Sequence, residues 1–372
     1  MIITISDVTL GYGSPQIISF TKEFAECNQD DFTILQPAVP YRQIVTDHKF
    51  AEKIRTLPTR EHPHSCLGRW QFFQQCKQFV QKYKPDTLIV SNYNLLPILE
   101  LLEFTPPKII NLVLEDCEHL KKSFHSKVLF SRLQKLSKQI DYWIFPEQNR
   151  AINDAELFSI PYEKIFVLPN VYEAKSTFHP KPKIPKILYA GTLDLDSSVA
   201  CHFTDPSVWK LPLDIYGDSQ GTPKNQDKLT SALNQARCAN MGLYWYGQVD
   251  AQTLDSLLSQ YAFSLVFWLP KRFALLNAAP NKFFQALAYG VPVITAPHPQ
   301  CKMYVERYNC GLVMKDWSKG ELIRTVQLGI KLFGTSQYQD MVGGTKQAIN
   351  QELNWKTQMK LLANKFRLKA HG

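Results

Sequence analysis

Short apolar runs alternate with stretches of helical periodicity along the whole chain. In the first half, the apolar runs of strand length lie at residues 2–5, 32–35, 87–90, 108–114 and 141–145. The stretches with a helical pattern lie at 16–27, 70–82 and 149–158. Strands that alternate with helices in this way are typical of α/β proteins built on parallel sheets. We therefore predict a parallel sheet in the first half.

The same alternation begins again after a break that is rich in proline and lysine. Residues 179–186 hold three prolines and three lysines, a composition that disfavours both a helix and a central strand. Predicted strands follow at 186–192, 213–218, 242–249, 263–268 and 310–313, the last of them at a sheet edge. Asp250 is predicted to cap a helix that runs to Tyr261, and further helices are predicted over 319–333 and 351–366.

These patterns predict two domains and a terminal helix. The first domain is predicted over residues 1–178 and the second over 186–345, with the proline-rich segment as the linker. The C-terminal helix is predicted over 346–372.

Residues 280–295 combine a short helix, a glycine stop and a buried strand. Pro280 suits the first helical turn, and Gly290 suits the left-handed position after the last turn. Residues 291–295 then suit a buried parallel strand. An ordinary αβ unit of any doubly wound protein would show the same pattern.

The two faces of this short helix differ in character. Helical spacing puts its apolar side chains on one face, at Phe283, Phe284, Leu287 and Ala288. It puts Asn281 and Gln285 on another face, with Lys282 beside them. Because a helix N-terminus is positively polarised, we predict that this end binds phosphate, as half of a nucleotide-sugar site.

The composition fits two folded domains and an anionic partner. The chain has 372 residues, of which 45% are hydrophobic, and this is enough for two packed cores. The net charge of +9 favours nucleotide phosphates, phospholipid head groups or nucleic acid, without choosing among them. The first seven residues have no basic leader, and no apolar run approaches the ~20 residues that cross a bilayer. We expect a soluble cytoplasmic protein, or one held at a membrane surface from outside the bilayer.

The cysteines favour free thiols over disulfides or zinc ligands. They are scattered and form no C-x-x-C pair, as expected in a reducing compartment. The run 62–66 contains two histidines and Cys66, but it lacks a second ligand pair at zinc spacing. Asp194 and Asp196 have the spacing of an Asp-x-Asp metal motif, and we interpret them as loop residues. No metal and no cofactor is predicted.

Three predicted strands of the second half end on glycine turns. The turns are Gly191-Thr192, Gly217-Asp218 and Gly247-Gln248. Ligands of an open parallel sheet bind outside the carboxyl ends of its strands, and glycine lets backbone N–H groups approach a ligand. Three such turns in order favour a binding site. The alternative is that they are ordinary turns that connect each strand to the following helix.

Together these segments resemble a known family. The order Tyr-Ala-Gly-Thr-Leu, Ile-Tyr-Gly-Asp, Tyr-Gly-Gln-Val, Pro-Asn-Lys-Phe-Phe-Gln, Ala-Tyr-Gly-Val-Pro-Val-Ile and Cys-Gly-Leu-Val resembles the donor half of GT-B glycosyltransferases, most of all the family 4 type. The similarity covers residues 186–315, and the first half matches in outline. It implies two Rossmann-like, doubly wound parallel-sheet domains that face a cleft, with a C-terminal helix that crosses back to the first domain.

The resemblance implies a binding site for a nucleotide-diphosphate sugar. The residues expected to bind this donor are Gly191, Thr192, Tyr216, Gly217, Tyr246, Gly247, Arg272, Asn277, Pro280, Asn281, Lys282 and Gln285. Lys282 would also act in catalysis, because its ammonium would stabilise the departing diphosphate. Gln285 would contact the ribose. Arg272 would be a second cation, or it would belong to a solvated loop.

In one respect the chain departs from the family pattern. Many family 4 enzymes carry two glutamates, eight residues apart, where this chain has Asn277 and Gln285. An amide hydrogen-bonds hydroxyl groups but cannot act as a carboxylate. The resemblance therefore leaves the stereochemical outcome and the sugar open.

The first half would hold the acceptor. A glycine turn follows its first strand and would admit an acceptor hydroxyl group, or serve as a plain βα turn; it consists of Gly11, Tyr12, Gly13 and Ser14. Another strand ends on acidic residues and a histidine. Asp116 is the first candidate for a general base and His119 the second, and each would otherwise be a loop residue or a helix cap.

The leading prediction is a metal-independent hexosyltransferase type of glycosyltransferase that acts on a saccharide or a lipid-linked acceptor. We expect a role in bacterial surface polysaccharide or glycolipid synthesis, in the cytoplasm or at the inner face of the plasma membrane. The segment 121–127 mixes cations with an aromatic residue and suits either a membrane surface or a solvated basic face.

Two alternatives stay open. A sugar-nucleotide epimerase of the same architecture would bind the donor and need no acceptor groove. A nucleic-acid-binding protein would need a concentrated basic stripe, whereas the Lys and Arg residues of this chain are spread over both halves.

Overall fold

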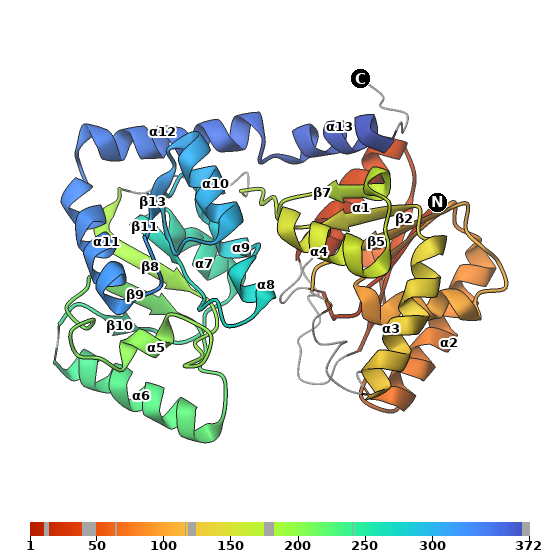
Figure 1. The fold of residues 1–372 in the computed structure, drawn as a ribbon, viewed down its shortest axis with the longest axis horizontal. Coiled ribbons are helices and arrows are strands. Elements are labelled where there is room, and N and C mark those ends of the chain that lie inside the picture. Colours follow the sequence, from red (N-terminus) through yellow and green to blue (C-terminus); the bar gives the residue numbers. More distant parts are fainter. Residues whose placement is uncertain are drawn as a thin grey trace. The chain divides into compact units, whose positions relative to one another are not determined.

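The chain forms two compact units (Figure 1). The computed structural model describes residues 1–10, 15–38, 50–63, 65–115, 117, 124–174, 182–239 and 241–366. The first unit comprises Met1–Pro169 together with Gln358–Gly372, and the second comprises Asn170–Thr357. Each unit is an α/β structure around a parallel sheet, and the prediction of parallel sheets is confirmed.

The first unit contains a seven-stranded sheet in the order β3-β2-β1-β4-β5-β6-β7. Its strands are β1 (Ile2–Ile5), β2 (Phe32–Pro37), β3 (Ile54–Leu57), β4 (Thr87–Ser91), β5 (Lys108–Leu112), β6 (Tyr142–Phe145) and β7 (Ile165–Val167). Its helices are α1 (Pro15–Asn28), α2 (Cys66–Tyr83), α3 (Phe124–Leu136) and α4 (Gln148–Phe158), with 3-10 turns at Ala51–Lys53, Tyr93–Leu101, Ser137–Gln139 and Tyr162–Lys164. Strands β1 and β4 are buried at every position, as expected for parallel strands covered on both faces.

The C-terminal helix α13 (Trp355–Phe366) begins in the second unit and ends in the first. The Phe366 ring stacks on the Tyr142 ring of β6, with their centroids 3.9 Å apart. It also contacts the Phe166 ring of β7 at 6.2 Å. The chain therefore returns to the first unit at its end, as the resemblance implies.

The second unit contains a six-stranded sheet in the order β10-β9-β8-β11-β12-β13. Its strands are β8 (Ile184–Ala190), β9 (Leu213–Tyr216), β10 (Tyr244–Trp245), β11 (Tyr261–Val266), β12 (Val293–Thr295) and β13 (Gly311–Val313). Its helices are α5 (Ala200–Phe203), α6 (Pro223–Cys238), α7 (Ala251–Leu258), α8 (Phe273–Leu276), α9 (Asn281–Ala288), α10 (Pro299–Tyr308), α11 (Lys319–Leu332) and α12 (Ser336–Gln351).

Alternate residues of the central strand β8 enter two different cores. Ile187 and Tyr189 pack with apolar residues of α6 and α11, whereas Leu188 packs with residues of α7, α9 and α10. This alternation places helices on both faces of the sheet. Among the described residues, none of the helices is both long enough and apolar enough to span a bilayer.

Several local predictions are confirmed. The Asp250 carboxylate caps α7, because it accepts hydrogen bonds from the N–H and the hydroxyl of Thr253 at 2.8 and 2.7 Å. Gly290 follows α9 with a φ of +67°. Strand β13 lies at the sheet edge.

The predicted linker is wrong in part. Residues 184–186 belong to β8, and the predicted linker residues 179–181 lie outside the described ranges. Pro185 is accommodated because the pairing of β8 with β11 shifts register beside it, between Tyr261 and Phe263. A proline at such an irregularity costs no ladder hydrogen bond, so composition alone misplaced the start of this strand.

Some predicted boundaries are also wrong. Helix α7 ends at Leu258, and Tyr261 begins β11 instead of ending the helix. Pro280 precedes α9 as its extended N-cap residue and is not part of its first turn. The predicted strand 242–249 is reduced to the two residues of β10. The helix predicted from residue 351 begins at Trp355, after the unpredicted helix α12.

Candidate functional site

The beginning of α9 carries a buried cation. The Lys282 Nζ atom is buried and makes no hydrogen bond with the residues that the structure describes. It lies 4.0 Å from the centre of the Tyr189 ring and 4.2 Å from the centre of the Trp268 ring. Burial lowers the pKa of Lys282 to about 7, because an ammonium group loses its hydration there. Cation–π attraction to the two rings offsets part of this loss. The amine therefore keeps its donors unused inside the protein.

Gly191, which directly follows β8, makes room for this amine. A Cβ atom placed on Gly191 would lie 2.8 Å from Lys282 Nζ, and the glycine φ is +144°. A larger residue would push the lysine aside and would be strained in this backbone conformation. The Tyr189 hydroxyl donates to the carbonyl oxygen of the exposed Thr192 at 3.0 Å, which ties the ring beside the lysine to the turn after the strand.

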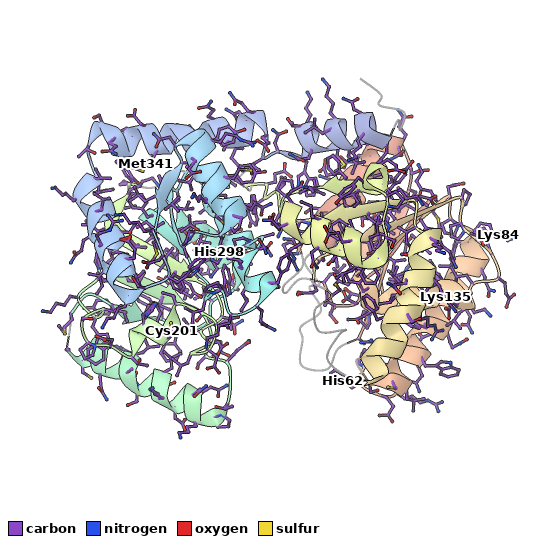
Figure 2. All side chains as sticks on the ribbon, in the orientation of Figure 1. His62, Lys84, Lys135, Cys201, His298 and Met341 are labelled. Carbon is purple, nitrogen blue, oxygen red and sulfur yellow. The ribbon has the colours of Figure 1, made fainter. Side chains whose placement is uncertain are left out.

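A histidine holds the loop that carries Trp268. His298 Nε2 accepts a hydrogen bond from the Trp268 backbone N–H at 3.2 Å, and Nδ1 lies 3.1 Å from the carbonyl oxygen of Leu276. Because Nε2 accepts, Nδ1 carries the proton and donates, and the ring is neutral. His298 lies within the second unit (Figure 2), and burial lowers its pKa to about 4. One imidazole thus fixes both ends of the segment 268–276.

Asn170 holds the start of α9. Its Nδ2 atom donates to the Ala279 carbonyl oxygen at 2.7 Å and to Asn281 Oδ1 at 2.9 Å. The Pro280 carbonyl oxygen accepts a hydrogen bond from the Phe283 N–H at 2.9 Å and starts the helical ladder. These contacts, together with the buried face of the helix, fix the position from which Lys282 extends.

Gln285 lies one turn after Asn281 and faces a buried carboxylate. Its Nε2 atom donates to Asp255 Oδ1 at 2.8 Å. The Tyr172 hydroxyl donates to the same oxygen at 2.8 Å, and Asp255 is only 5% exposed. Burial, reinforced by this carboxylate, raises the pKa of Tyr172 well above its usual value. Helices α7 and α9 are therefore joined to the segment 170–174 at one carboxylate.

The three predicted glycine turns lie side by side at the carboxyl ends of β8, β9 and β10. The Gly191 N–H donates to the Tyr216 carbonyl oxygen at 2.9 Å, and the Gly217 N–H donates to the Gly247 carbonyl oxygen at 2.8 Å. The Tyr216 and Tyr246 rings stack with centroids 4.9 Å apart and planes 9° from parallel. Tyr246 is 51% exposed, so an aromatic surface is open to solvent beside these turns.

Arg272 and Asn277 flank the short helix α8. The Arg272 side chain is exposed, in the N-cap position of this helix. Asn277 follows the helix and is 3% exposed, and its Nδ2 atom donates to the Phe273 carbonyl oxygen at 3.1 Å. At least one donor of the Asn277 amide is thus used to close α8.

The candidate residues of the first unit lie outside the described ranges; they are Gly11, Tyr12, Gly13, Ser14, Asp116 and His119. The described part of this unit has a polar network at the carboxyl ends of β1 and β4. The Asp7 carboxylate accepts hydrogen bonds from Ser91 Oγ at 3.0 Å and from Asn92 Nδ2 at 2.9 Å. Asn92 has a φ of +57°, and its Oδ1 atom accepts from the Glu115 N–H at 2.9 Å.

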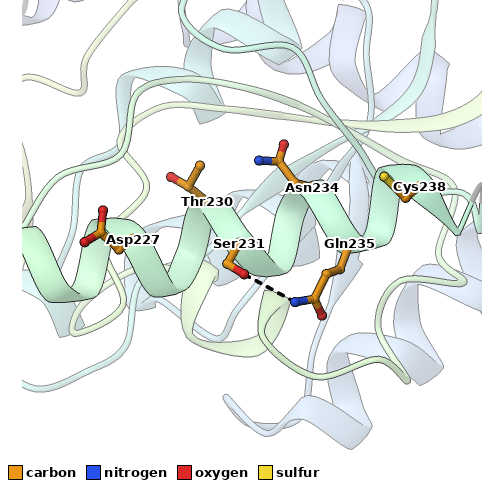
Figure 3. Close-up of a pocket in the computed structure, with 6 residues that line it drawn as sticks. All are labelled: Asp227, Thr230, Ser231, Asn234, Gln235 and Cys238. Atoms are coloured by element: carbon orange, nitrogen blue, oxygen red, sulfur yellow. Dashed lines mark hydrogen bonds between the residues drawn. The ribbon is translucent and has the colours of Figure 1, made fainter.

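A hollow elsewhere in the second unit follows the outer side of α6 (Figure 3). It is lined by Asp227, Thr230, Ser231, Asn234, Gln235 and Cys238. All of these residues come from one helix, and none belongs to the group around Lys282. This hollow is therefore separate from the group around Lys282.

Sequence reasoning missed several residues of this group, namely Asn170, Tyr189, Asp255, Trp268 and His298. Tyr189 carried a usable signal, because it lies two residues before Gly191 in a predicted strand. The others contact α9 or its neighbouring loop from distant parts of the sequence. No periodicity or turn signal marks such contacts.

Solved structures reveal what the chain resembles. No protein-family model matches the sequence, and no curated protein sequence matches it. Its structure matches sucrose-phosphate synthase from Thermosynechococcus elongatus with a TM-score of 0.69 and 13% identity over 98% of each chain. It matches WaaG, a glycosyltransferase of lipopolysaccharide biosynthesis, with a TM-score of 0.66 and 10% identity over 98% of this chain and 99% of the other. It matches Anabaena HepE in complex with UDP with a TM-score of 0.68 and 11% identity over the same shares. The chain therefore has the fold of the GT-B glycosyltransferases.

Proposed function

We propose that the protein is a glycosyltransferase that moves a sugar from a nucleotide-diphosphate sugar to a hydroxyl acceptor. The observation that carries this proposal is Lys282, a buried amine with unused donors at the start of α9, beside Gly191. A diphosphate is the ligand class that suits a cation at a helix N-terminus. The fold supports this proposal, because WaaG is a glycosyltransferase and the structure of HepE was solved in complex with UDP.

In this proposal, Lys282 acts on the leaving group. Charge accumulates on the diphosphate as its bond to the sugar breaks, and an ammonium group in a dry site stabilises that charge. A nearby diphosphate favours the charged form of the lysine, so that ligand binding would raise its lowered pKa. Arg272, exposed in the same loop region, would add a second cation. These cations would act without a metal ion or cofactor.

The rest of the donor would lie along the three glycine turns. The exposed ring of Tyr246, stacked on Tyr216, offers a surface for a nucleobase near Gly217 and Gly247. Gln285 would contact the ribose from α9. Thr192 and Asn281 would line the diphosphate.

The acceptor would bind to the first unit. The turn 11–14 would admit its hydroxyl group, and Asp116 or His119 would act as the general base. We propose a saccharide or lipid-linked acceptor, because WaaG and the lipopolysaccharide galactosyltransferase WaaB share the fold. Leu67 and Trp70, 53% and 56% exposed on α2, would contact a membrane surface at the cytoplasmic face.

The test is a thermal-shift screen of the full chain with UDP, GDP, ADP, CDP and dTDP and their sugars. A ligand that binds only the native form raises the melting temperature. We expect a shift with at least one nucleoside diphosphate, and transfer of its sugar to a saccharide acceptor. No shift with any of them would refute the proposal.

A further inference from the structure

Asp255 is a buried carboxylate with two neutral hydrogen-bond donors on one oxygen. Gln285 Nε2 and the Tyr172 hydroxyl each lie 2.8 Å from Asp255 Oδ1. The contact to Gln285 joins α7 to the helix that carries Lys282. Burying a carboxylate is costly unless hydrogen bonds satisfy it, so the hydrogen bond from the Gln285 amide stabilises Asp255 in its buried position.

The hydrogen bond to Asp255 fixes the orientation of the Gln285 side-chain amide. An ionised carboxylate only accepts hydrogen bonds, so the amide must turn its NH2 group toward Asp255. The carbonyl oxygen Oε1 then points away from the carboxylate. Gln285 is partly exposed, and its Oε1 atom accepts no hydrogen bond from the described part of the chain. An acceptor of fixed direction thus stands one turn from the start of α9.

We propose that Asp255 is a positioning residue that holds the Gln285 carbonyl oxygen ready to accept a hydrogen bond from a ribose hydroxyl group of the nucleotide-sugar donor. This inference rests on the proposed function. A ribose fits because it offers hydroxyl donors next to the diphosphate that Lys282 would bind. Asp255 itself does not touch the donor; it acts only through Gln285.

The same contact explains why an amide stands at position 285. A glutamate there would bring a second carboxylate within about 3 Å of Asp255, at the distance of the present hydrogen bond. Two like charges at such a distance cannot both stay ionised. The hydrogen bond therefore needs one carboxylate and one amide. Exchanging the two groups, with the amide at position 255 and the carboxylate at position 285, should preserve it.

The experiment measures the dissociation constants of the nucleoside diphosphate found by the thermal-shift screen and of its 2′-deoxy and 3′-deoxy analogues. In the unaltered protein, we expect at least one analogue to bind about three- to tenfold more weakly, the effect of one hydrogen bond. Asp255→Asn should abolish most of this preference, because asparagine can accept or donate and leaves the Gln285 amide free to turn over. Gln285→Glu should weaken binding of all three ligands.

The double variant Asp255→Asn with Gln285→Glu is the decisive sample. In it, the new amide at position 255 would donate to one oxygen of the new carboxylate at position 285. The second oxygen of that carboxylate would accept from the ribose, so the preference for the hydroxyl-bearing ligand should return. Tyr172→Phe is the matched control. It removes the other hydrogen bond to the same Asp255 oxygen, so it should lower the melting temperature and leave the ribose preference unchanged.

The outcomes separate this inference from the proposed function. If no nucleoside diphosphate binds the unaltered protein, both are refuted. If one binds and Asp255→Asn retains the full ribose preference, or the double variant fails to regain it while remaining folded, only the positioning role of Asp255 is refuted. If Tyr172→Phe abolishes the preference as well, Asp255 acts through general stability and the inference is wrong.

Discussion

Lys282 Nζ lies 4.2 Å from the centre of the Trp268 ring, and His298 holds the backbone N–H of that tryptophan. The buried amine therefore depends on a loop that a neutral imidazole fixes. Together with Tyr189 and Gly191, this arrangement encloses a cation that no described carboxylate neutralises. Such a group costs stability in the free protein, and an anionic ligand would recover that cost.

Replacing Lys282 by alanine should abolish most of the transfer activity while the fold persists. Loss of one electrostatic donor at a developing charge costs about 10²- to 10³-fold in kcat. Steady-state kinetics with the identified donor measures this loss, and circular dichroism checks the fold. Lys302→Ala removes an exposed lysine of α10 and should retain full activity. Equal activity of both variants would exclude a role for Lys282.

Binding of the diphosphate should take up a proton above about pH 7. The pKa of Lys282 is about 7 in the free protein, and a bound anion raises it, so the amine must acquire a proton on binding. Calorimetry in two buffers with different ionisation enthalpies measures the uptake. The variant Lys282→Met should bind the nucleoside diphosphate weakly, and this binding should take up no proton. Proton release, or no exchange at pH 8, would contradict a lysine role in binding the diphosphate.

Lys282 should also make stability depend on alkaline pH. Its folded pKa of about 7 lies below the unfolded value of 10.5, so the unfolded chain binds more protons between these values. Stability therefore gains a contribution that increases as the pH rises from about 7 to about 10.5. Urea unfolding at several pH values measures it. Lys282→Met should reduce this gain, and identical pH profiles would show that the amine is not buried.

The loss of folding stability at acid pH should depend on His298. Its pKa of about 4 lies below the unfolded value of 6.5, so the contribution of the neutral ring is present above pH 6.5 and is lost as the pH falls toward 4. His298→Gln keeps a donor and an acceptor but cannot be protonated. We expect this variant to lose less stability between pH 6.5 and pH 4.5 than the unaltered protein. The Lys282 amine also lowers the pKa of His298, and because its own pKa is about 7 it is mostly charged below pH 6.5 and contributes little to the difference.

Gly191→Ala should impair donor binding through Lys282. The added Cβ would lie 2.8 Å from Nζ in a left-handed backbone position, so the lysine must move. We expect an increase in KM of about tenfold, with a melting temperature lowered by a few degrees, in line with strain of about 1–3 kcal/mol. Gly320→Ala is the control, because its nearest contact is 3.9 Å away.

A double variant sharpens this test. In Lys282→Ala the added methyl group at position 191 meets open space, so its effect on donor binding should disappear. The two substitutions are then strongly non-additive, as expected for residues in contact. Additive effects would mean that Gly191 acts through its backbone alone.

The sequence by itself determined the local structure. The alternation of apolar runs and helical periodicity predicted two parallel-sheet units, because both periods are properties of neighbouring residues. Asp250 and Gly290 marked helix ends, because a cap or a left-handed residue acts within one turn. The polar start of α9 was also visible, including Lys282, since one helix carries it.

Tertiary structure decided what surrounds that lysine. Tyr189, Trp268 and His298 come from three different elements, and Asp255 meets Gln285 across two helices. Such contacts depend on where the sheet order and the loops place each element, and no local pattern encodes them. Pro185 gives the same lesson for the fold, because only the register shift against β11 makes room for it inside β8. Neighbouring residues thus specified the helices and strands. The packing of distant segments buried the Lys282 amine and left its hydrogen-bond donors unused within the described part of the chain.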